Sequence, residues 1–171
     1  MIKYLPFIVM SLVVVLITIK KVVSAPSNFS KLVWLSLIVY VISVFWLILI
    51  PKDTTLESML PYGAKLIGHA IVIVKPYSGL ADSSRENVIM TIPAGIYLYL
   101  FTRHHHLNIL EVILIALGTG IFNESIQFIL DQTFRINRVV ETMDVLDNSL
   151  GVFLGYYWLR ISFIVQAHTK I

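Results

Sequence analysis

Five hydrophobic segments divide the chain, with polar or mixed stretches between them. A membrane-crossing helix needs about 20 mostly apolar residues. The segments that meet or approach this length are residues 4–23, 32–50, 88–101, 107–130 and 145–165. The third is short for a span and would have to include flanking residues such as Glu86 and Asn87. The pattern predicts an all-α integral membrane bundle of about five transmembrane helices.

One connection, residues 51–86, is much longer than the others. Within it, residues 66–74 are apolar but too few to cross a bilayer as a helix. We therefore expect an interfacial or re-entrant segment between helices 2 and 3, over residues 64–76, rather than a sixth span.

Composition supports a membrane protein and excludes several other classes. Hydrophobic residues make up 57% of the chain and charged residues 13%, against about 25% charged in an average soluble domain. The 171 residues fit a single membrane domain. The absence of cysteine excludes disulfides, thiolate metal sites and thiol catalysis. The net charge of +3 is spread out and forms no basic face for nucleic acid.

Basic residues in the short loops indicate the orientation, since lysine and arginine favour the cytoplasmic side. Lys20, Lys21 and Lys31 flank the first loop, and Arg103 follows the third segment. We expect these loops and the C-terminus to be cytoplasmic, with the N-terminus outside. The first segment resembles a cleaved signal peptide, but the two lysines that follow its apolar core favour an uncleaved span.

A polar stripe enters the last hydrophobic segment. At about 100° per residue, five of its positions fall within an arc of roughly 80° on a helix: Glu141, Asp144, Asn148, Gly151 and Gly155. Acids and amides on one line of a membrane helix are unfavourable unless they meet partners or water. The glycine pair at four-residue spacing permits close approach of another helix.

Because antiparallel spans alternate in direction, the polar residues of three segments should meet at one membrane face. Asn87 enters the third segment, Glu124 and Gln127 leave the fourth, and Arg138 lies in the next loop. Together with Glu141, Asp144 and Asn148 they predict a shallow polar pocket at the outer leaflet. Below it we expect close helix packing at Pro93, Gly95, Gly120, Gly151 and Gly155.

Less specific interpretations apply to the same residues. The acids could form a structural network with Arg138, and that arginine could simply contact lipid phosphate. We expect Asp131 and Asp147 to be solvated or interfacial, and His69 to contact a headgroup rather than to catalyse. The run His104, His105 and His106 resembles a metal tract, but a basic loop without a nearby carboxylate is the better interpretation. No metal or other cofactor is expected.

Three stretches give the sequence a resemblance to the VanZ-like family of bacterial membrane proteins. The first runs from Asn87 through Pro93 to Gly95, and the second is Glu124-Ser125-Ile126-Gln127. The third has Arg138, Glu141, Asp144, Asn148, Gly151 and Gly155-Tyr156 at matching spacing. The resemblance covers residues 87–156 well and 32–160 loosely, which leaves 1–31 as an N-terminal span and basic loop.

The sequence differs from the usual pattern of this family at three positions. Thr91 stands where the family usually has phenylalanine, Glu141 where it has aspartate, and Met143 where a second acid is expected. The resemblance implies a multi-pass protein of the bacterial plasma membrane. The family's founding member is linked to low-level resistance to teicoplanin-type glycopeptide antibiotics.

Three functions follow as hypotheses. In the first, the pocket binds a membrane lipid or lipid-linked envelope molecule, with Arg138 on an anionic headgroup and Asn87, Gln127 and Asn148 orienting it. In the second, the protein is an intramembrane enzyme in which Glu124 or Asp144 acts as general base. In the third, the glycine seam packs against a partner in an envelope complex.

Overall fold

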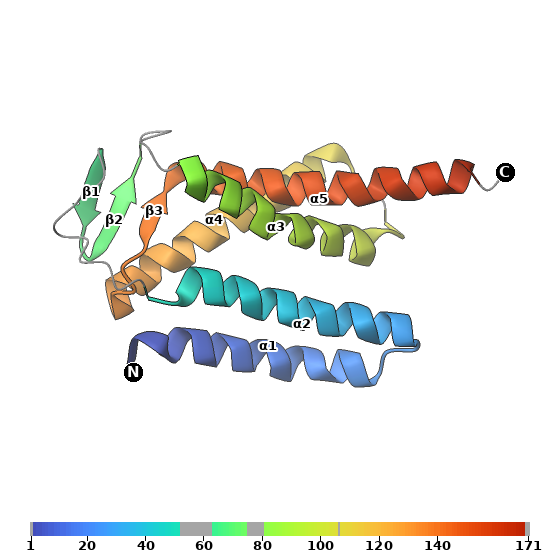
Figure 1. Ribbon diagram of the computed structural model, residues 1–171, viewed down its shortest axis with the longest axis horizontal. Helices are drawn as coiled ribbons and strands as arrows, with labels where there is room; N and C mark the ends of the chain where they lie inside the picture. The colour runs from blue at the N-terminus through green and yellow to red at the C-terminus, as the bar shows by residue number, and fades with distance from the viewer. Residues whose placement is uncertain (1, 52–62, 75–80, 106, 170–171) are drawn as a thin grey trace.

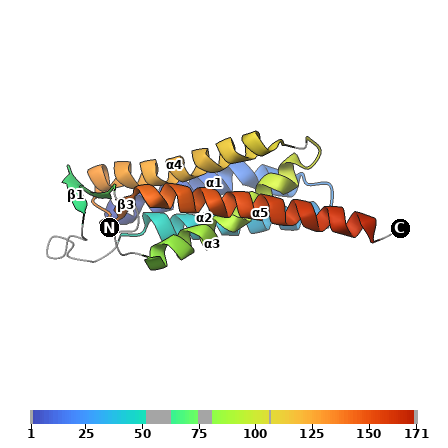
Figure 2. The same ribbon diagram turned by 90° about the horizontal axis from the view of Figure 1, so that it is seen from above.

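The computed structural model describes residues 2–51, 63–74, 81–105 and 107–169. Within these residues the chain forms a bundle of five α-helices with a small sheet at one end (Figures 1 and 2). The helices are α1 (Leu5–Val23), α2 (Asn28–Leu49), α3 (Ala81–Thr102), α4 (Ile109–Phe134) and α5 (Thr142–His168), and a short 3-10 turn, η1 (Ile2–Tyr4), precedes them. The two termini lie at opposite ends of the bundle, as an odd number of spans requires.

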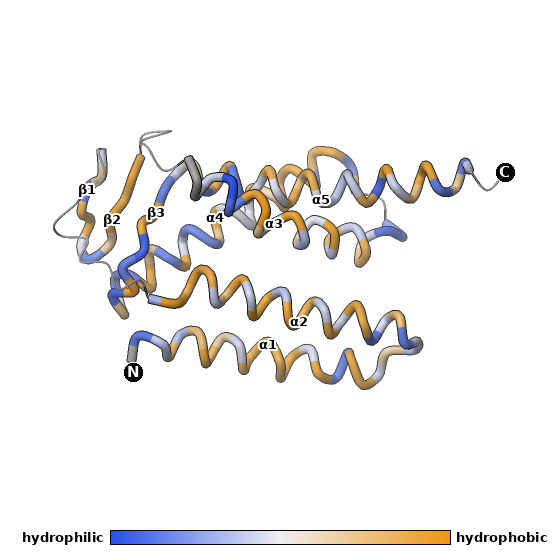
Figure 3. Tube along the Cα trace, viewed as in Figure 1, coloured by the Kyte–Doolittle hydropathy of each residue, from blue (hydrophilic) through white to orange (hydrophobic). Residues whose placement is uncertain are grey.

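Helices α1 and α2 form an antiparallel pair along one side of the bundle. The Ser27 side chain accepts a hydrogen bond from the Ser30 N–H and so caps the start of α2. Lys20 and Lys21 lie in the last turn of α1, where cations favour the helix dipole. Both helices are apolar along most of their length (Figure 3), which suits faces that contact lipid.

Helices α3 and α5 form the most extensive contact in the molecule. Their backbones meet at glycines: a Cβ at Gly95 would collide with the Val152 carbonyl, and a Cβ at Gly155 with the Ile92 carbonyl. Gly151 lies against the Val88 carbonyl in the same way. Since real side chains cannot approach so closely, these positions hold α3 against α5.

Helix α4 packs on the other side of α5. It begins with a capping box, in which the Asn108 side chain accepts from the Glu111 N–H and the Glu111 side chain accepts from the Asn108 N–H. Gly120 faces the Val145 carbonyl and the Ser149 side chain of α5. Helix α5 is thus the central helix of a three-helix core.

A three-stranded sheet covers the end of this core where α4 stops and α5 starts. Its strands are β1 (Ala64–Ile67), β2 (Ala70–Ile73) and β3 (Val139–Glu141), in the order β1-β2-β3. The first two form an antiparallel hairpin, whereas β2 and β3 run parallel. Ala70, Ile71 and Ile73 of β2 are buried. We call this sheet the cap.

The structure confirms the all-α bundle of about five membrane helices. Four of the helices are long and apolar enough to cross a membrane: α1, α2, α4 and α5. Helix α3 is not among the four, although its 22 residues match the others in length. The apolar run at 66–74 forms most of the hairpin, because it bends at Gly68 (φ 63°) and pairs with β3, which is distant in sequence.

Candidate functional site

Four carboxylate side chains gather where α4, β3 and α5 meet beneath the cap. They are Glu124, Glu141, Asp144 and Asp147, which we call the acid cluster. Glu124, Glu141 and Asp147 are buried, with 6%, 6% and 8% of their surface exposed. The carboxylates of Asp144 and Glu141 both act electrostatically on Glu124. Acids this close and this buried are stable together only with donors or protons among them.

The strand β3 holds one acid of the cluster against another. The Glu141 backbone N–H donates to Oε2 of Glu124 at 3.2 Å, so a carboxylate of α4 fixes the chain as it leaves the strand for α5. Burial raises the pKa of Glu141, and the nearby charge of Asp147 raises it further. Protonation of Glu141 is therefore easier than for a solvated glutamate.

Two polar contacts tie α3 to this part of α5. The Ser84 hydroxyl donates to Oδ2 of Asp147 at 2.6 Å, and the Thr91 hydroxyl donates to the Asn148 carbonyl at 2.8 Å. The side chain of Asn148 is almost fully buried, and its Oδ1 has no hydrogen-bond partner among the described residues. A buried amide oxygen without a donor is unfavourable, so this atom can accept from a ligand or a water.

Arg138 joins the C-terminal ends of α2 and α4. Its Nε donates to the Ile50 carbonyl at 3.2 Å, and its backbone N–H donates to Oδ1 of Asp131, also at 3.2 Å. Burial lowers the pKa of Arg138, and the charge of Asp131 acts in the opposite direction. Arg138 therefore has a structural role, because it connects α2 to α4. It also places a positive charge in the buried polar region where α4, β3 and α5 meet, which we call the junction.

The loop between α4 and β3 has an unusual backbone. Arg135 and Asn137 adopt positive φ values of 51° and 57°, which residues other than glycine rarely do. The Asp131 carboxylate compensates by accepting from the backbone N–H of Arg138 through Oδ1, and it lies close to the backbone of Ile136 and Asn137. This acid fixes the direction in which the chain enters β3.

The tip of the hairpin rests on the end of α4. The Gln132 side chain accepts from the His69 N–H at 3.1 Å and donates to the Ile67 carbonyl at 2.6 Å. The ring Nε2 of His69 lies 3.3 Å from the Arg135 guanidinium. Further along, the Thr142 hydroxyl donates to the Val74 carbonyl. The cap is therefore anchored at both ends, to α4 and to α5.

The remaining predicted site residues lie at or near this end of the core. Asn87 and Gln127 are half-buried on α3 and α4. Pro93 lies inside α3, and three residues before it the Met90 carbonyl accepts from the Tyr40 hydroxyl of α2 at 2.9 Å. This bond connects α3 to α2.

The expectation that Asp131 and Asp147 would be solvated or interfacial is wrong. Their side chains are only 1% and 8% exposed, because Asp131 closes the loop after α4 and Asp147 accepts from Ser84. A signal for Asp131 was present in the sequence, since it follows Glu124 by seven residues on one helix face. Ser84, in contrast, carries no signal that distinguishes it from other serines.

His104 and His105 lie in an exposed turn after α3, and His106 lies outside the described residues. Within the described ranges, no three histidine, aspartate or glutamate side chains gather as metal ligands.

The fold and the buried polar junction define a multi-pass helical membrane protein. Comparison with protein families matches residues 37–164 to VanZ/LLP1. The match covers most of the chain, from the middle of α2 to four residues before the end of α5, and the protein belongs to this family. Comparisons with curated proteins and with solved structures give no match.

Proposed function

We propose that the protein binds a lipid-linked or lipid-like molecule of the cell envelope at the outer leaflet, with the acid cluster as its headgroup site. The observation that supports this most is the gathering of Glu124, Glu141, Asp144 and Asp147 beside a buried Asn148 oxygen that lacks a donor. Such a junction favours a headgroup rich in hydrogen-bond donors, such as sugar hydroxyls or amines.

The surrounding residues have compatible roles in this proposal. Asn87, Gln127 and Asn148 orient the headgroup through their amides. Arg138 carries a positive charge at the edge of the junction, where a phosphate linking the headgroup to its lipid would pass. The N-terminus and the cap face outward, because the opposite end carries Lys20, Lys21, Lys31 and Arg103.

Binding of an envelope precursor or anchor would change how that molecule is presented outside the cell. We therefore propose that expression of the protein lowers susceptibility to teicoplanin-type glycopeptides. The measurement is the inhibitory concentration of teicoplanin in a strain that lacks the chain, with and without its expression. An unchanged concentration at full expression would contradict this part of the proposal and leave binding itself to the following experiment.

Mass spectrometry of co-purified lipids tests the headgroup site. The wild-type protein should carry a specific lipid-linked species that Arg138→Ala and Asp144→Asn lose in large part. Glu86→Gln is the matched control, because Glu86 lies on α3 at the same end of the bundle but is exposed. If Arg138→Ala retained the same lipid in the same amount, Arg138 would have no headgroup role.

A second candidate, an intramembrane acid–base enzyme, is favoured by one observation. Glu124 on α4 and Asp144 on α5 are close enough for their charges to interact, so one can hold a proton while the other accepts one. Glu124→Gln and Asp144→Asn would then abolish turnover of the bound lipid while its binding persists. Loss of binding and turnover together, in folded protein, would favour the binding function.

The glycine seam provides no support for a packing partner. Gly95, Gly151 and Gly155 are all in contact with backbone of the chain's own helices, so these surfaces are already occupied. Gly120 is occupied by α5 in the same way.

A further inference from the structure

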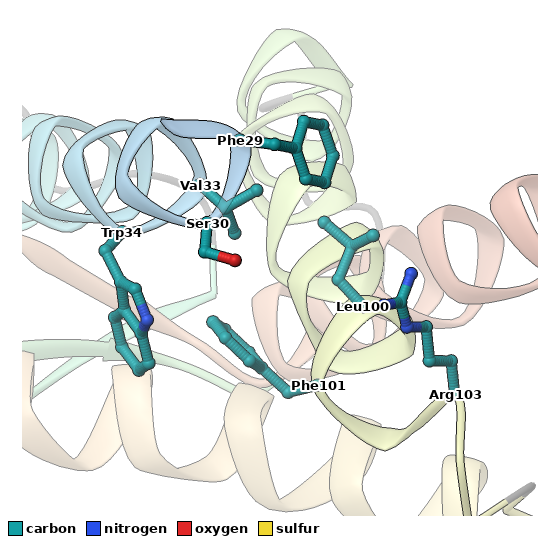
Figure 4. Close-up of a pocket in the computed structure, with 7 residues that line it drawn as sticks. All are labelled: Phe29, Ser30, Val33, Trp34, Leu100, Phe101 and Arg103. Atoms are coloured by element: carbon teal, nitrogen blue, oxygen red, sulfur yellow. The ribbon is translucent and has the colours of Figure 1, made fainter. Parts of the chain in front are cut away.

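The end of the bundle opposite the cap contains a cavity between α2 and α3. Its volume is about 160 Å3. Side chains from the first turns of α2, from the last turn of α3 and from the residue that follows α3 line it: Phe29, Ser30, Val33, Trp34, Leu100, Phe101 and Arg103 (Figure 4). None of these residues belongs to the acid cluster or to the cap.

Five of the seven residues that line this cavity are apolar, and they lie beside a lipid-facing surface. The rings of Trp34 and Phe101 have centroids 4.8 Å apart and close one side. Phe29 and Phe101 remain 65% and 45% exposed, although they are large apolar side chains. Contact with these apolar side chains stabilises a bound hydrocarbon chain but not a soluble ion.

The polar groups of the cavity favour an anion. The Ser30 hydroxyl is directed into the space framed by Phe29, Leu100 and Phe101, and the Arg103 guanidinium stands at its edge beyond Leu100 (Figure 4). The sequence contains no aspartate or glutamate from residue 1 to 52 or from 87 to 110. Both walls of the cavity therefore come from segments without any acid.

From these observations we infer that the cavity between α2 and α3 holds an anionic phospholipid, with its phosphate at Arg103 and an acyl chain along Trp34 and Phe101. A guanidinium at the membrane surface attracts the phosphate of an anionic lipid. Bound lipid would fill a space that α2 and α3 leave open, since these two helices touch over a small area. The lipid would thus help to attach the α1–α2 pair to the core.

Quenching of Trp34 by brominated lipids tests this site directly. The substitutions Trp46→Phe and Trp158→Phe leave Trp34 as the sole tryptophan of the chain. The protein is placed in phosphatidylcholine vesicles that contain brominated phosphatidylglycerol or, in a parallel series, brominated phosphatidylcholine. We expect phosphatidylglycerol to quench Trp34 at about fivefold lower mole fraction, the preference that one basic residue near the surface provides.

Arg103→Gln should abolish the preference for the anionic lipid. Arg85→Gln is its matched control, because Arg85 is also an exposed arginine but lies in α3 near its start, at the other end of the bundle. The control should quench like the parent protein. Equal quenching by the two lipids in the parent protein, or a preference that survives Arg103→Gln, would refute the site.

A steric variant separates occupation of the cavity from charge alone. Ser30→Leu fills the space and leaves every charge in place, so it should weaken quenching by phosphatidylglycerol. Ser43→Leu, an exposed position on the same helix, should not. Millimolar inorganic phosphate should leave the quenching unchanged, whereas displacement by phosphate would identify a free-anion site instead.

Discussion

The α1–α2 pair and the three-helix core of α3, α4 and α5 are both helical, but different forces hold them. In the most apolar window of α1, 6% of the residues are buried within the protein, against 28% for α4. The pair presents apolar side chains outward, whereas the core brings backbones together at glycines and buries four acids of the junction, Glu124, Asp131, Glu141 and Asp147. The family match also begins within α2 and covers all of the core except the last four residues of α5.

This difference indicates where sequence is constrained most strongly. Lipid accepts almost any apolar side chain on the α1–α2 pair. In the core, few other residues can replace a glycine at a contact between backbones or an acid in the buried cluster. Substitutions of equal size should therefore have unequal effects in the two parts of the molecule.

The largest effect should come from Gly155→Leu. The new side chain would collide with the Ile92 carbonyl, a backbone atom that cannot move without separating α3 from α5. We expect destabilisation of about 3 kcal/mol or more. Gly118→Leu is the control, because an added Cβ there has nothing within 4 Å, and its effect should stay within about 0.5 kcal/mol. Unfolding free energies by steric trapping in bicelles would measure both.

Asp131→Ala should have the next largest effect. It removes the acceptor of the Arg138 backbone N–H and the charge beside the Arg138 guanidinium. The expected loss is about 2–3 kcal/mol, with increased hydrogen exchange at residues 136–138. Asp131→Asn retains an acceptor and should lose less. If both variants exchanged like the wild type, Asp131 would not hold the loop.

Thr91→Val removes one buried hydroxyl and preserves the shape of the side chain. The lost bond to the Asn148 carbonyl should lower the stability of the core by about 1 kcal/mol. Thr119→Val is a suitable control on α4, because its hydroxyl bonds only within its own helix. Equal thermal stability of the two variants in detergent would show that the bond between α3 and α5 is unimportant.

Tyr40→Phe tests the attachment between the two parts. Loss of the bond to the Met90 carbonyl should lower stability by about 0.5–1 kcal/mol. It should also broaden the distance distribution between spin labels on α2 and α5, since α2 would move more freely. Tyr4→Phe, at an exposed tyrosine, should leave that distribution unchanged.

The smallest effect concerns pH. The pKa of Glu141 is raised in the folded protein above its ordinary value of 4.5, so the folded state binds the proton more tightly than the unfolded state. Stability is therefore highest below the ordinary value and falls as pH rises through the raised one. Glu141→Gln should reduce this fall in melting temperature, and a steeper fall in the variant would contradict the assignment.

Much of the fold and the chemical character of the junction could be predicted from the sequence. The hydrophobic segments located all five helices, because a helix that crosses a membrane needs about 20 mostly apolar residues. The seven-residue spacing of Glu124 and Asp131 placed both on one face, but their burial depends on the loop that follows. The cap was not predicted, because the apolar run at 66–74 is ambiguous between helix and strand. Its partner strand β3 is also distant in sequence. The bond from Arg138 to the Ile50 carbonyl could not be predicted either, because it depends on how α2 ends.

The parallel pairing of β2 with β3 has a consequence for the order of assembly. The hairpin is synthesised before α3 and α4, yet its partner strand β3 follows only after α4 in the chain. Until then the open edge of β2 has no partner, and Glu124 has no Glu141 N–H to bind. The junction is therefore completed late in biogenesis, and a chain arrested before residue 139 would expose its acids in an unfinished bundle.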